Sequence, residues 1–224
     1  MTTSQSPKPP SPRTRVRRLH EKAAYDAATI AAVLDAMPLA HVGHLVGGAP
    51  VVTPTLQWRI GARVFWHGSA ASRMMKAAAG AQVCLTVTCV DGMVLARSGL
   101  EHSVNYRSVM VFGEAEAVAG AEAKEAALKA MLEQLFPGRW AALRPMTAQE
   151  LKATAILSLP LTEASAKIAA GPPTDPPEDV GWPVWAGELP MATAVLPPVA
   201  APDLAPDLAD PPPYLAAFRW GERR

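Results

Sequence analysis

The stretch "FWHGSAASRMMKAA", residues 65–78, changes character in its middle. An aromatic, strand-like opening gives way to a glycine, a histidine, hydroxyl side chains and cations, namely His67, Gly68, Ser69, Ser72, Arg73 and Lys76. If a strand ends near His67 and a helix begins near Ser72, the first-turn amides of that helix are unpaired and carry partial positive charge. Serine hydroxyls and the planar fork of an arginine suit phosphate oxygens, so this turn predicts a bound phosphate group.

A simpler interpretation of the same residues stays open at this point. The serines would cap the helix, while Arg73 and Lys76 would form its solvated face. An isolated Ser-x-x-Ser-Arg sequence fits that interpretation well, because serine is a common N-cap residue. The choice between a phosphate site and a solvated, serine-capped helix depends on the rest of the sequence.

The residues around this stretch predict many short strands and few helices. Segments rich in β-branched and aromatic residues lie at 39–46, 50–58, 60–68, 82–90, 93–98, 105–120 and 154–170. Asp91-Gly92 between two of these segments predicts a hairpin turn. Apolar residues at helical spacing occur within 21–37 and 121–136. The pattern favours a mainly β fold, a small antiparallel barrel with peripheral helices, and the chain has no G-x-G-x-x-G or Walker sequence.

Composition excludes several classes of protein. The chain has 224 residues, half of them hydrophobic, which is enough to bury one sizeable core. A formal net charge of +1 argues against a general nucleic-acid binder, which needs clustered cations to displace counterions. Since no apolar run approaches membrane-spanning length and no secretory signal is visible, we expect a cytoplasmic protein without membrane partners.

Proline and charge divide the chain into three parts. Residues 1–14 are basic and rich in proline and serine, which predicts a disordered tail. Residues 15–171 form the predicted barrel domain. Residues 172–224 contain 13 of the 23 prolines, so this segment is expected to form neither regular sheet nor long helix and to pack only partly on the barrel.

The cysteines and two of the histidines offer no metal site. Cys84 and Cys89 are five positions apart in a predicted strand, so they point to opposite faces and are expected to be free thiols. His41 and His44, three apart, also face opposite sides. We therefore predict no bound metal at these residues.

The order of motifs resembles one known family. The stretch at 65–78, taken with "PVVTPT" (50–55), "NYRSVMVFGEAEAV" (105–118), "EASAKIAAGPPTD" (163–175) and "WAGELP" (185–190), is similar to the pyridoxamine 5′-phosphate oxidase-like family. Within it, the resemblance is to the flavin-nucleotide-binding, nitroimidazole-resistance-like branch. The resemblance implies an antiparallel six-stranded split β-barrel that forms a homodimer, with two FMN molecules at the subunit interface.

The same resemblance implies the residues that bind FMN. The phosphate would lie at Ser72 and Arg73. Because Met74 follows the Ser-Arg pair where the oxidases commonly have lysine, the second phosphate cation would be Lys76 or Arg107, or would be absent. Residues lining the approach would be His67, Gly68 and Ser69, and those at the isoalloxazine edge Val52, Thr53 and Pro54. The partner subunit would contribute Tyr106, Arg107 and Ser108, and the C-terminal part Lys167 and Trp185.

Plainer roles remain open for four of these residues. Tyr106 and Arg107 point to opposite faces of a strand, so one could pack in the core while the other is a surface cation. Trp185 could pin the tail onto the barrel, and Lys167 could be a solvated strand residue.

The function implied is that of an FMN-dependent oxidoreductase. Flavin carries hydride chemistry itself, so no dedicated acid or base is needed, and a nicotinamide donor such as NAD(P)H would reduce it before a small electron-poor acceptor takes the electrons. Nitro-aromatics are one such acceptor class. The chain lacks the Arg-x-His with which the oxidases hold their vitamin substrate, which argues against oxidation of pyridoxamine phosphate. The alternative is a flavin- or haem-binding module without turnover, in which His67 or His102 would ligate the iron.

Overall fold

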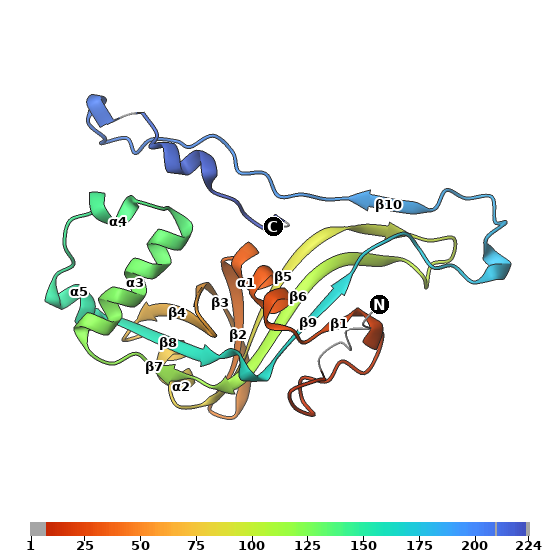
Figure 1. Cartoon of the computed structure of the whole chain (residues 1–224), viewed down its shortest axis with the longest axis horizontal. Coiled ribbons are helices and arrows are strands. Elements are labelled where there is room, and N and C mark those ends of the chain that lie inside the picture. The colour runs from red at the N-terminus through yellow and green to blue at the C-terminus, as the bar shows by residue number, and fades with distance from the viewer. Residues whose placement is uncertain (1–7, 209, 223–224) are drawn as a thin grey trace, which may run out of the picture.

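The computed structural model describes residues 8–208 and 210–222, which form one mainly antiparallel sheet with peripheral helices (Figure 1). The strands are β1 (Ala23–Ala24), β2 (Leu39–Val46), β3 (Ala49–Ile60), β4 (Arg63–Ser69), β5 (Gln82–Leu95), β6 (Ser103–Glu114), β7 (Glu116–Ala117), β8 (Thr154–Pro160), β9 (Ala164–Ala169) and β10 (Gly187–Pro190). The helices are α1 (Ala27–Ala36), α2 (Arg73–Ala78), α3 (Ala121–Leu135), α4 (Arg139–Ala142) and α5 (Ala148–Ala153). Short 3-10 helices lie at His20–Lys22, Leu161–Glu163, Pro177–Asp179, Pro206–Leu208 and Pro213–Ala217.

The strand order is β1-β9-β6-β5-β2-β3-β4-β8-β7, with β10 paired to one end of β5. The predicted β class with peripheral helices is confirmed, but the predicted number of six strands is wrong, because the described residues form a sheet of ten. Three of the ten, β1, β7 and β10, are only two to four residues long and lie on free edges of longer strands. Edge strands leave backbone groups unpaired, and such short additions satisfy some of them.

Two hydrophobic clusters lie on opposite sides of the sheet. The larger one fills the concave inner face, where Trp66, Leu85 and Val109 are almost completely buried beside residues of α1 and α2. The smaller one lies on the outer face, where α3 and α5 cover Trp58 and Ile156. The helices therefore cover the outer face over β4, β8 and the end of β3 near Trp58, and they leave the outer face of β2, β5, β6 and the rest of β3 open.

The predicted hairpin at Asp91-Gly92 is wrong, because β5 runs unbroken through both residues. The strand accommodates them as an irregularity, since its register with β6 shifts between Val90 and Gly92. Gly92 is required there because a Cβ atom would lie 2.8 Å from the carbonyl oxygen of Leu189 on β10. The Asp-Gly pattern predicts a turn from local sequence alone. Here the Asp91 carboxylate binds Arg107 on β6, and the backbone of β10 packs against Gly92, so the pair stays within the strand.

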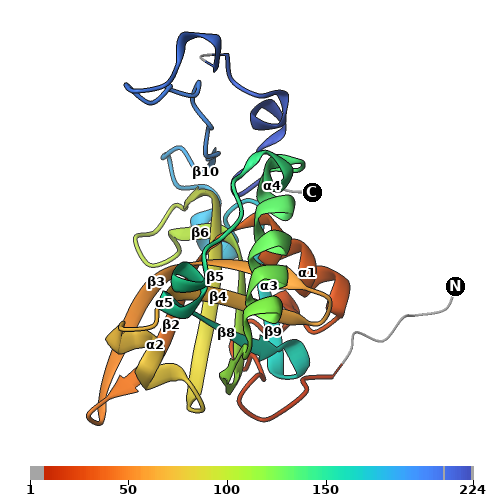
Figure 2. The same cartoon turned by 90° about the vertical axis from the view of Figure 1, so that its left-hand side faces the viewer.

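The C-terminal segment crosses the far end of the sheet from α2 in both views (Figures 1 and 2). Contrary to the expectation of no regular sheet after residue 171, β10 pairs with β5 in register Gly187↔Leu95 to Pro190↔Gly92. Its proline stands at the last position, where a missing N–H costs little. The expected disorder of residues 1–14 falls partly on residues 1–7, which lie outside the described residues.

The two cysteines lie on opposite faces of their strand, as predicted, and so do His41 and His44. Cys89 is buried while Cys84 is half-buried on the other face of β5, and both are free. His44 is buried while its neighbour on the opposite face of β2, His41, is exposed. Among the described residues, no cluster of His, Cys, Asp and Glu side chains is arranged to hold a metal ion.

Helix α1 begins at a capping aspartate that offers a test of local stability. The carboxylate of Asp26 accepts a hydrogen bond of 2.8 Å from the Thr29 amide, and this bond lowers the pKa of Asp26. We expect Asp26→Ala to reduce the free energy of unfolding by about 1 kcal/mol at pH 7. Because the folded-state pKa is lowered, this contribution is present above the ordinary aspartate pKa and disappears as the pH falls through the folded value. Denaturant unfolding of both proteins at pH 7 and in acid measures it; an equal difference at both pH values would contradict the role of the charge.

Candidate functional site

The turn between β4 and α2 has the strand–turn–helix geometry predicted from residues 65–78. Strand β4 ends at Ser69, whose hydroxyl accepts a hydrogen bond from the Ala71 amide at 3.2 Å. Ser72 is the N-cap residue of α2, and its own side chain forms no capping hydrogen bond. Met74, Met75 and Ala78 anchor the helix in the inner core. Ser69 therefore stabilises the turn, and the hydroxyl of Ser72 is left available.

Two cations project from this helix into solvent. Arg73 and Lys76 are both exposed, and among the described residues neither side chain forms an ion pair. The amides of the first turn have no partners within the helix, so their partial positive charges add to the two side chains. Gly68 lets α2 lie close to β4, because a Cβ atom there would be 3.0 Å from Met75 Cγ. The turn is thus a compact group of donors that can receive an anion.

Other predicted site residues lie on the outer face of the sheet. Thr53 of β3 is opposite the buried residue Val42 and therefore points to the inner face. Its neighbours Val52 and Pro54 point to the outer face, because side chains alternate along a strand. Across the sheet, Pro54 is opposite His41, which is opposite Thr86, which is opposite Met110. The open outer face therefore runs from β3 to β6 without a covering helix.

The partner-subunit candidates lie further along that same face. Tyr106 and Ser108 alternate on β6 with the inward residues Arg107 and Val109, and Ser108 is opposite Lys167 of β9. Neighbouring strands are about 4.8 Å apart, so these residues lie roughly 14 Å or more from Val52 and Pro54. One subunit therefore presents the two groups on one surface but does not bring them together.

Arg107 lies on the inner face and has partners there. Only 8% of it is exposed, and its Nε and Nη2 donate to the Asp91 carboxylate at 2.9 and 2.8 Å. Nη2 also donates to the carbonyl of Gly221 at 2.7 Å, which ties down the C-terminal segment. The hydrogen bonds to Asp91 raise the pKa of Arg107, so it is always charged. In this subunit it holds structure together rather than facing the open surface.

We expect Arg107→Met to lower the free energy of unfolding by about 3 kcal/mol, because removing one member of a buried ion pair leaves the other charge in a poor environment. The exposed pair Arg144–Glu150 supplies the control, and Arg144→Met should change stability little. Denaturant unfolding of both variants measures the difference. Equal stability of Arg107→Met and the parent protein would show that the pair contributes nothing.

His67 lies at the boundary between the helix-covered and open parts of the outer face. Its ring is 5.8 Å from the ring of Trp58, and its backbone oxygen accepts a hydrogen bond from Thr55 on β3 at 3.4 Å. Nδ1 is buried and has no hydrogen-bond partner among the described residues. Burial lowers the pKa of His67, so the imidazole is neutral at pH 7. A neutral, half-buried imidazole is a suitable ligand for a metal-containing group.

The remaining candidates lie apart from the β4–α2 turn. His102 is exposed in the β5–β6 connection, with Nδ1 2.9 Å from the carbonyl oxygen of Ser98. Trp185 is 66% exposed and lies two residues before β10, which is far from α2 in Figure 1. Lys167 Nζ donates to the carbonyl of Arg18 at 3.3 Å. Within one subunit, only the residues of β3, β4 and α2 form a local group.

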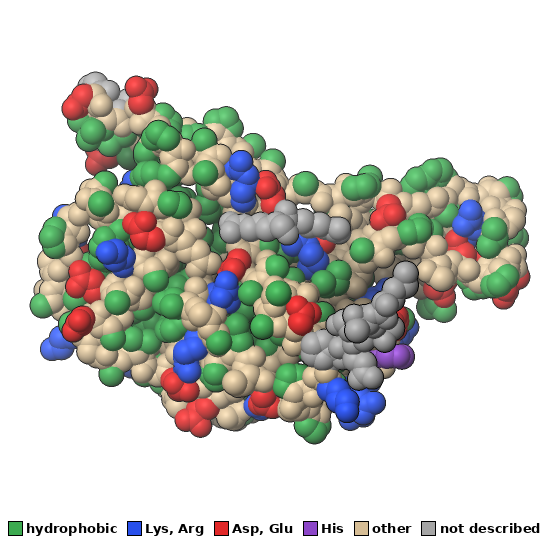
Figure 3. All heavy atoms as spheres, viewed as in Figure 1, with side chains coloured by type: hydrophobic (Ala, Val, Ile, Leu, Met, Phe, Trp, Pro, Cys, Tyr) green, Lys and Arg blue, Asp and Glu red, His purple; other side chains and the backbone are tan. Residues whose placement is uncertain are grey.

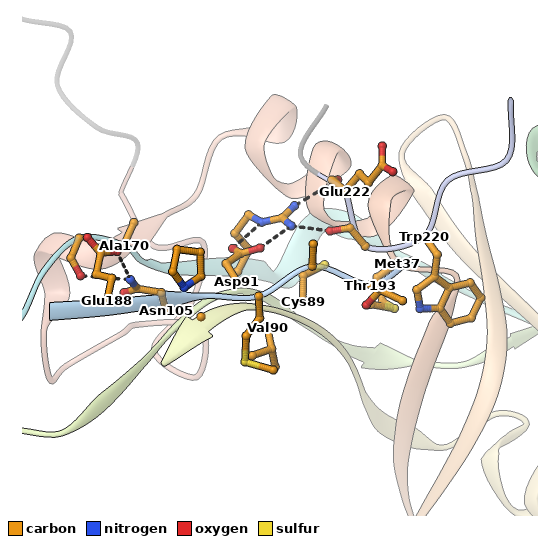
Figure 4. Close-up of a pocket in the computed structure, with 17 residues that line it drawn as sticks. Met37, Cys89, Val90, Asp91, Asn105, Ala170, Glu188, Thr193, Trp220 and Glu222 are labelled. Carbon is orange, nitrogen blue, oxygen red and sulfur yellow. Dashed lines mark hydrogen bonds and ion pairs between the residues drawn. The ribbon is translucent and has the colours of Figure 1, made fainter. Parts of the chain in front are cut away.

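The structure also reveals a cavity of about 600 Å³ that the sequence did not predict (Figure 4). It lies between the inner face of β5 and β6 and the C-terminal segment, with the Arg107–Asp91 pair in its wall. Asn105 donates to Glu188 at 2.7 Å at one end, and Trp220 lies at the other (Figure 4). One signal for this cavity is present in the sequence, namely Asp91, which the Asp-Gly pattern predicts in a turn and which lies in β5.

The comparisons with known proteins agree with this architecture. The family model described as pyridoxamine 5′-phosphate oxidase matches residues 26–168. The chain belongs to the pyridoxamine 5′-phosphate oxidase family. No match was found among proteins of curated function.

Two solved structures match this family member over most of its length. The flavocytochrome Anf3 from Azotobacter vinelandii is 47% identical, with a TM-score of 0.92 over 96% of this chain and 100% of that one. The FAD and heme binding protein from Mycobacterium smegmatis is 37% identical, with a TM-score of 0.83 over 89% of this chain and 98% of that one. A 5-nitroimidazole antibiotic resistance protein from Bacteroides thetaiotaomicron, described as putative, is 17% identical, with a TM-score of 0.53 over 65% and 86%, and shares the fold.

Proposed function

We propose that the protein binds a flavin at the open outer face, with a flavin phosphate at the β4–α2 turn, and acts in electron transfer. The observation that carries this proposal is the group of uncommitted donors at the turn, Arg73, Lys76 and the Ser72 hydroxyl. Phosphate is the anion that such a cluster of amides, hydroxyl and arginine suits best. Two long, similar relatives named as a flavocytochrome and as an FAD and heme binding protein support the choice of flavin.

The flavin could be FMN, as the sequence predicts, or FAD, as the name of the Mycobacterium smegmatis relative suggests. Both carry the ribityl phosphate that Ser72 and Arg73 would hold. We favour FAD, because that relative is 37% identical and covers 89% of this chain. Identification of the released flavin separates the two.

A homodimer would complete the site. The open outer face carries exposed apolar side chains on four adjacent strands, including Leu45 (61% exposed), Val52 (66%), Val90 (48%) and Met110 (42%). Exposed apolar side chains spread over one uncovered sheet face support a role of this face as an interface. A second copy on this face would bring its Tyr106, Ser108 and Lys167 toward the first copy's Val52, Pro54 and β4–α2 turn. Arg107 and Trp185 have less support as flavin contacts. Arg107 lines the inner cavity, and Trp185 lies next to β10, which is far from α2 in Figure 1.

Haem is the second cofactor we propose, on the strength of one residue. His67 offers a neutral imidazole next to Trp58, with a buried ring nitrogen that lacks a partner among the described residues. Both long relatives have names that include a cytochrome or heme. The flavin and haem alternatives predicted from the sequence would then apply to one protein. The iron ligand would lie on β4, and the phosphate ligands would lie at the start of the next element, α2.

A bound flavin would supply hydride or single-electron transfer. The chain's own residues would bind and orient it: Arg73 and Ser72 hold phosphate, and Lys167 of the partner could stabilise negative charge on the ring system. A nicotinamide donor and a small electron-poor acceptor remain the proposed reactants, in a cytoplasmic protein. Among the described residues, no helix has the length and hydrophobicity to span a membrane.

The visible spectrum of the purified protein tests the proposal, followed by acid release and mass identification of each chromophore. We expect a flavin band together with a Soret band. A flavin band alone would leave the phosphate assignment and remove the haem assignment. A colourless protein that also fails to bind added FMN or FAD would contradict the proposed function.

A further inference from the structure

A second group of unpaired cations lies on the N-terminal segment, where it runs along the edge of β9. Residues 8–26 contain six lysines and arginines and only two carboxylates. Arg13 is paired with Glu163, and Asp26 caps α1. Among the described residues, Arg15, Arg17 and Arg18 form no ion pair. In Figure 3, lysine or arginine side chains and a histidine gather over the region that Figure 1 colours red.

The backbone of this segment is fixed rather than free. Thr14 is 2% exposed, and its hydroxyl donates to the Ser11 carbonyl at 2.9 Å. The Val16 amide donates to the Tyr25 hydroxyl at 3.0 Å, and the carbonyl of Arg18 accepts from Lys167. Leu19 has φ = 54°, and it is the one non-glycine residue with positive φ among those described. Such a conformation persists only when the surroundings impose it, so the arginines stand on a defined scaffold.

These residues enclose a concave site of about 670 Å³. Its lining consists of Pro9, Arg15, Val16, Arg17, His20 and Tyr25. The lining thus combines two guanidinium groups and an imidazole with a tyrosine ring, a valine and a proline. The carboxylate of Glu21 approaches His20 Nδ1 at 3.9 Å, and it compensates only a part of this positive charge.

We propose that this site binds the phosphate groups of an adenine nucleotide. Arginine forks match phosphate oxygens in pairs, and an imidazole N–H can add a third donor. The aromatic and apolar side chains of the lining can contact a planar base, which an inorganic anion lacks. A mixed lining of this kind distinguishes a nucleotide site from a merely solvated cationic surface.

Two ligands share this chemistry: a free nucleotide such as an electron-donating dinucleotide, and the ADP half of a bound FAD. The second version rests on the proposed function. It is suggested by the hydrogen bond from Lys167 to the Arg18 carbonyl, which places the segment beside a residue of the proposed flavin face. The first version requires no flavin at all.

The test is calorimetric binding of ADP to the full chain as purified and after removal of any flavin. We expect the double variant Arg15→Gln/Arg17→Gln to weaken ADP binding about tenfold or more. Lys129→Gln/Lys152→Gln, which removes two exposed helical cations and the same net charge, should leave ADP affinity unchanged. ADP should also bind more tightly than pyrophosphate, because pyrophosphate cannot contact Tyr25.

The outcomes separate the two sources. ADP binding to the flavin-loaded protein that is lost in the double variant identifies a free-nucleotide site. ADP binding only to the flavin-free chain, with weaker FAD but unchanged FMN affinity in the double variant, identifies the ADP half of FAD. No ADP binding at millimolar concentration, or equal losses in the two double variants, would overturn the proposal. Failure of the protein to bind any flavin would contradict the proposed function but leave the ADP measurement intact.

Discussion

Replacing Arg73 with alanine is expected to raise the dissociation constant for flavin by roughly 10- to 100-fold, because a hydrogen bond to a charged group contributes about 1.5–3 kcal/mol. The arginine begins α2, beside the unpaired first-turn amides and the free Ser72 hydroxyl. It forms no ion pair in the described part of the chain, so no internal partner loses its contact in the variant. Fluorescence titration of the flavin-free protein with FMN and with FAD measures the change.

Three further variants show whether the effect belongs to the phosphate. Arg73→Lys keeps the charge without the fork and should fall between the parent protein and Arg73→Ala. Lys76→Ala should weaken binding less, because Lys76 lies one helical turn from the first amides. Lys129→Ala removes an exposed cation of α3 and should have no effect. Wild-type flavin affinity in Arg73→Ala would show that the phosphate lies elsewhere.

The β4–α2 turn was predictable because its geometry depends on neighbours in the sequence. A strand ending near Ser69, a turn of small residues and a helix with Met74 and Met75 in the core follow from local spacing alone. The assignment of Tyr106 and Arg107 to opposite faces followed from strand alternation in the same way. Local periodicity therefore identified the residues and their faces.

Interactions between distant segments were beyond such reasoning. The Asp91-Gly92 pair predicts a turn, but two distant segments keep it in a strand. Arg107, the partner of Asp91, lies sixteen residues away on the next strand, and β10, which packs against Gly92, lies almost a hundred residues later. The cavity under the C-terminal segment depends on the same contacts and on the carbonyl of Gly221. Proline content correctly predicted an extended tail there, but it carried no information about which edge the tail would pair with.

Replacing His67 with alanine is expected to abolish the Soret band of the purified protein while flavin remains bound. Its imidazole is the half-buried one beside the proposed flavin site, and the lowered pKa keeps it in the neutral form that ligates iron. His102→Ala is the matched control, since His102 is exposed and its Nδ1 is engaged with the Ser98 carbonyl in the β5–β6 connection. Absorption spectra of both variants, normalised to protein, measure haem content. Loss of the Soret band in His102→Ala alone would transfer the ligand role to that residue.

The pH dependence gives an independent check on the same residue. Protons compete with iron for an imidazole nitrogen, and burial lowers the pKa of His67 below the ordinary histidine value of about 6.5. Haem ligated by His67 should therefore keep its spectrum as the pH falls from 7 to 6. Because burial also opposes protonation of the folded protein, acid should release haem only together with loss of structure, which circular dichroism at each pH would detect. Haem loss between pH 7 and pH 6 with the fold intact would contradict ligation by His67.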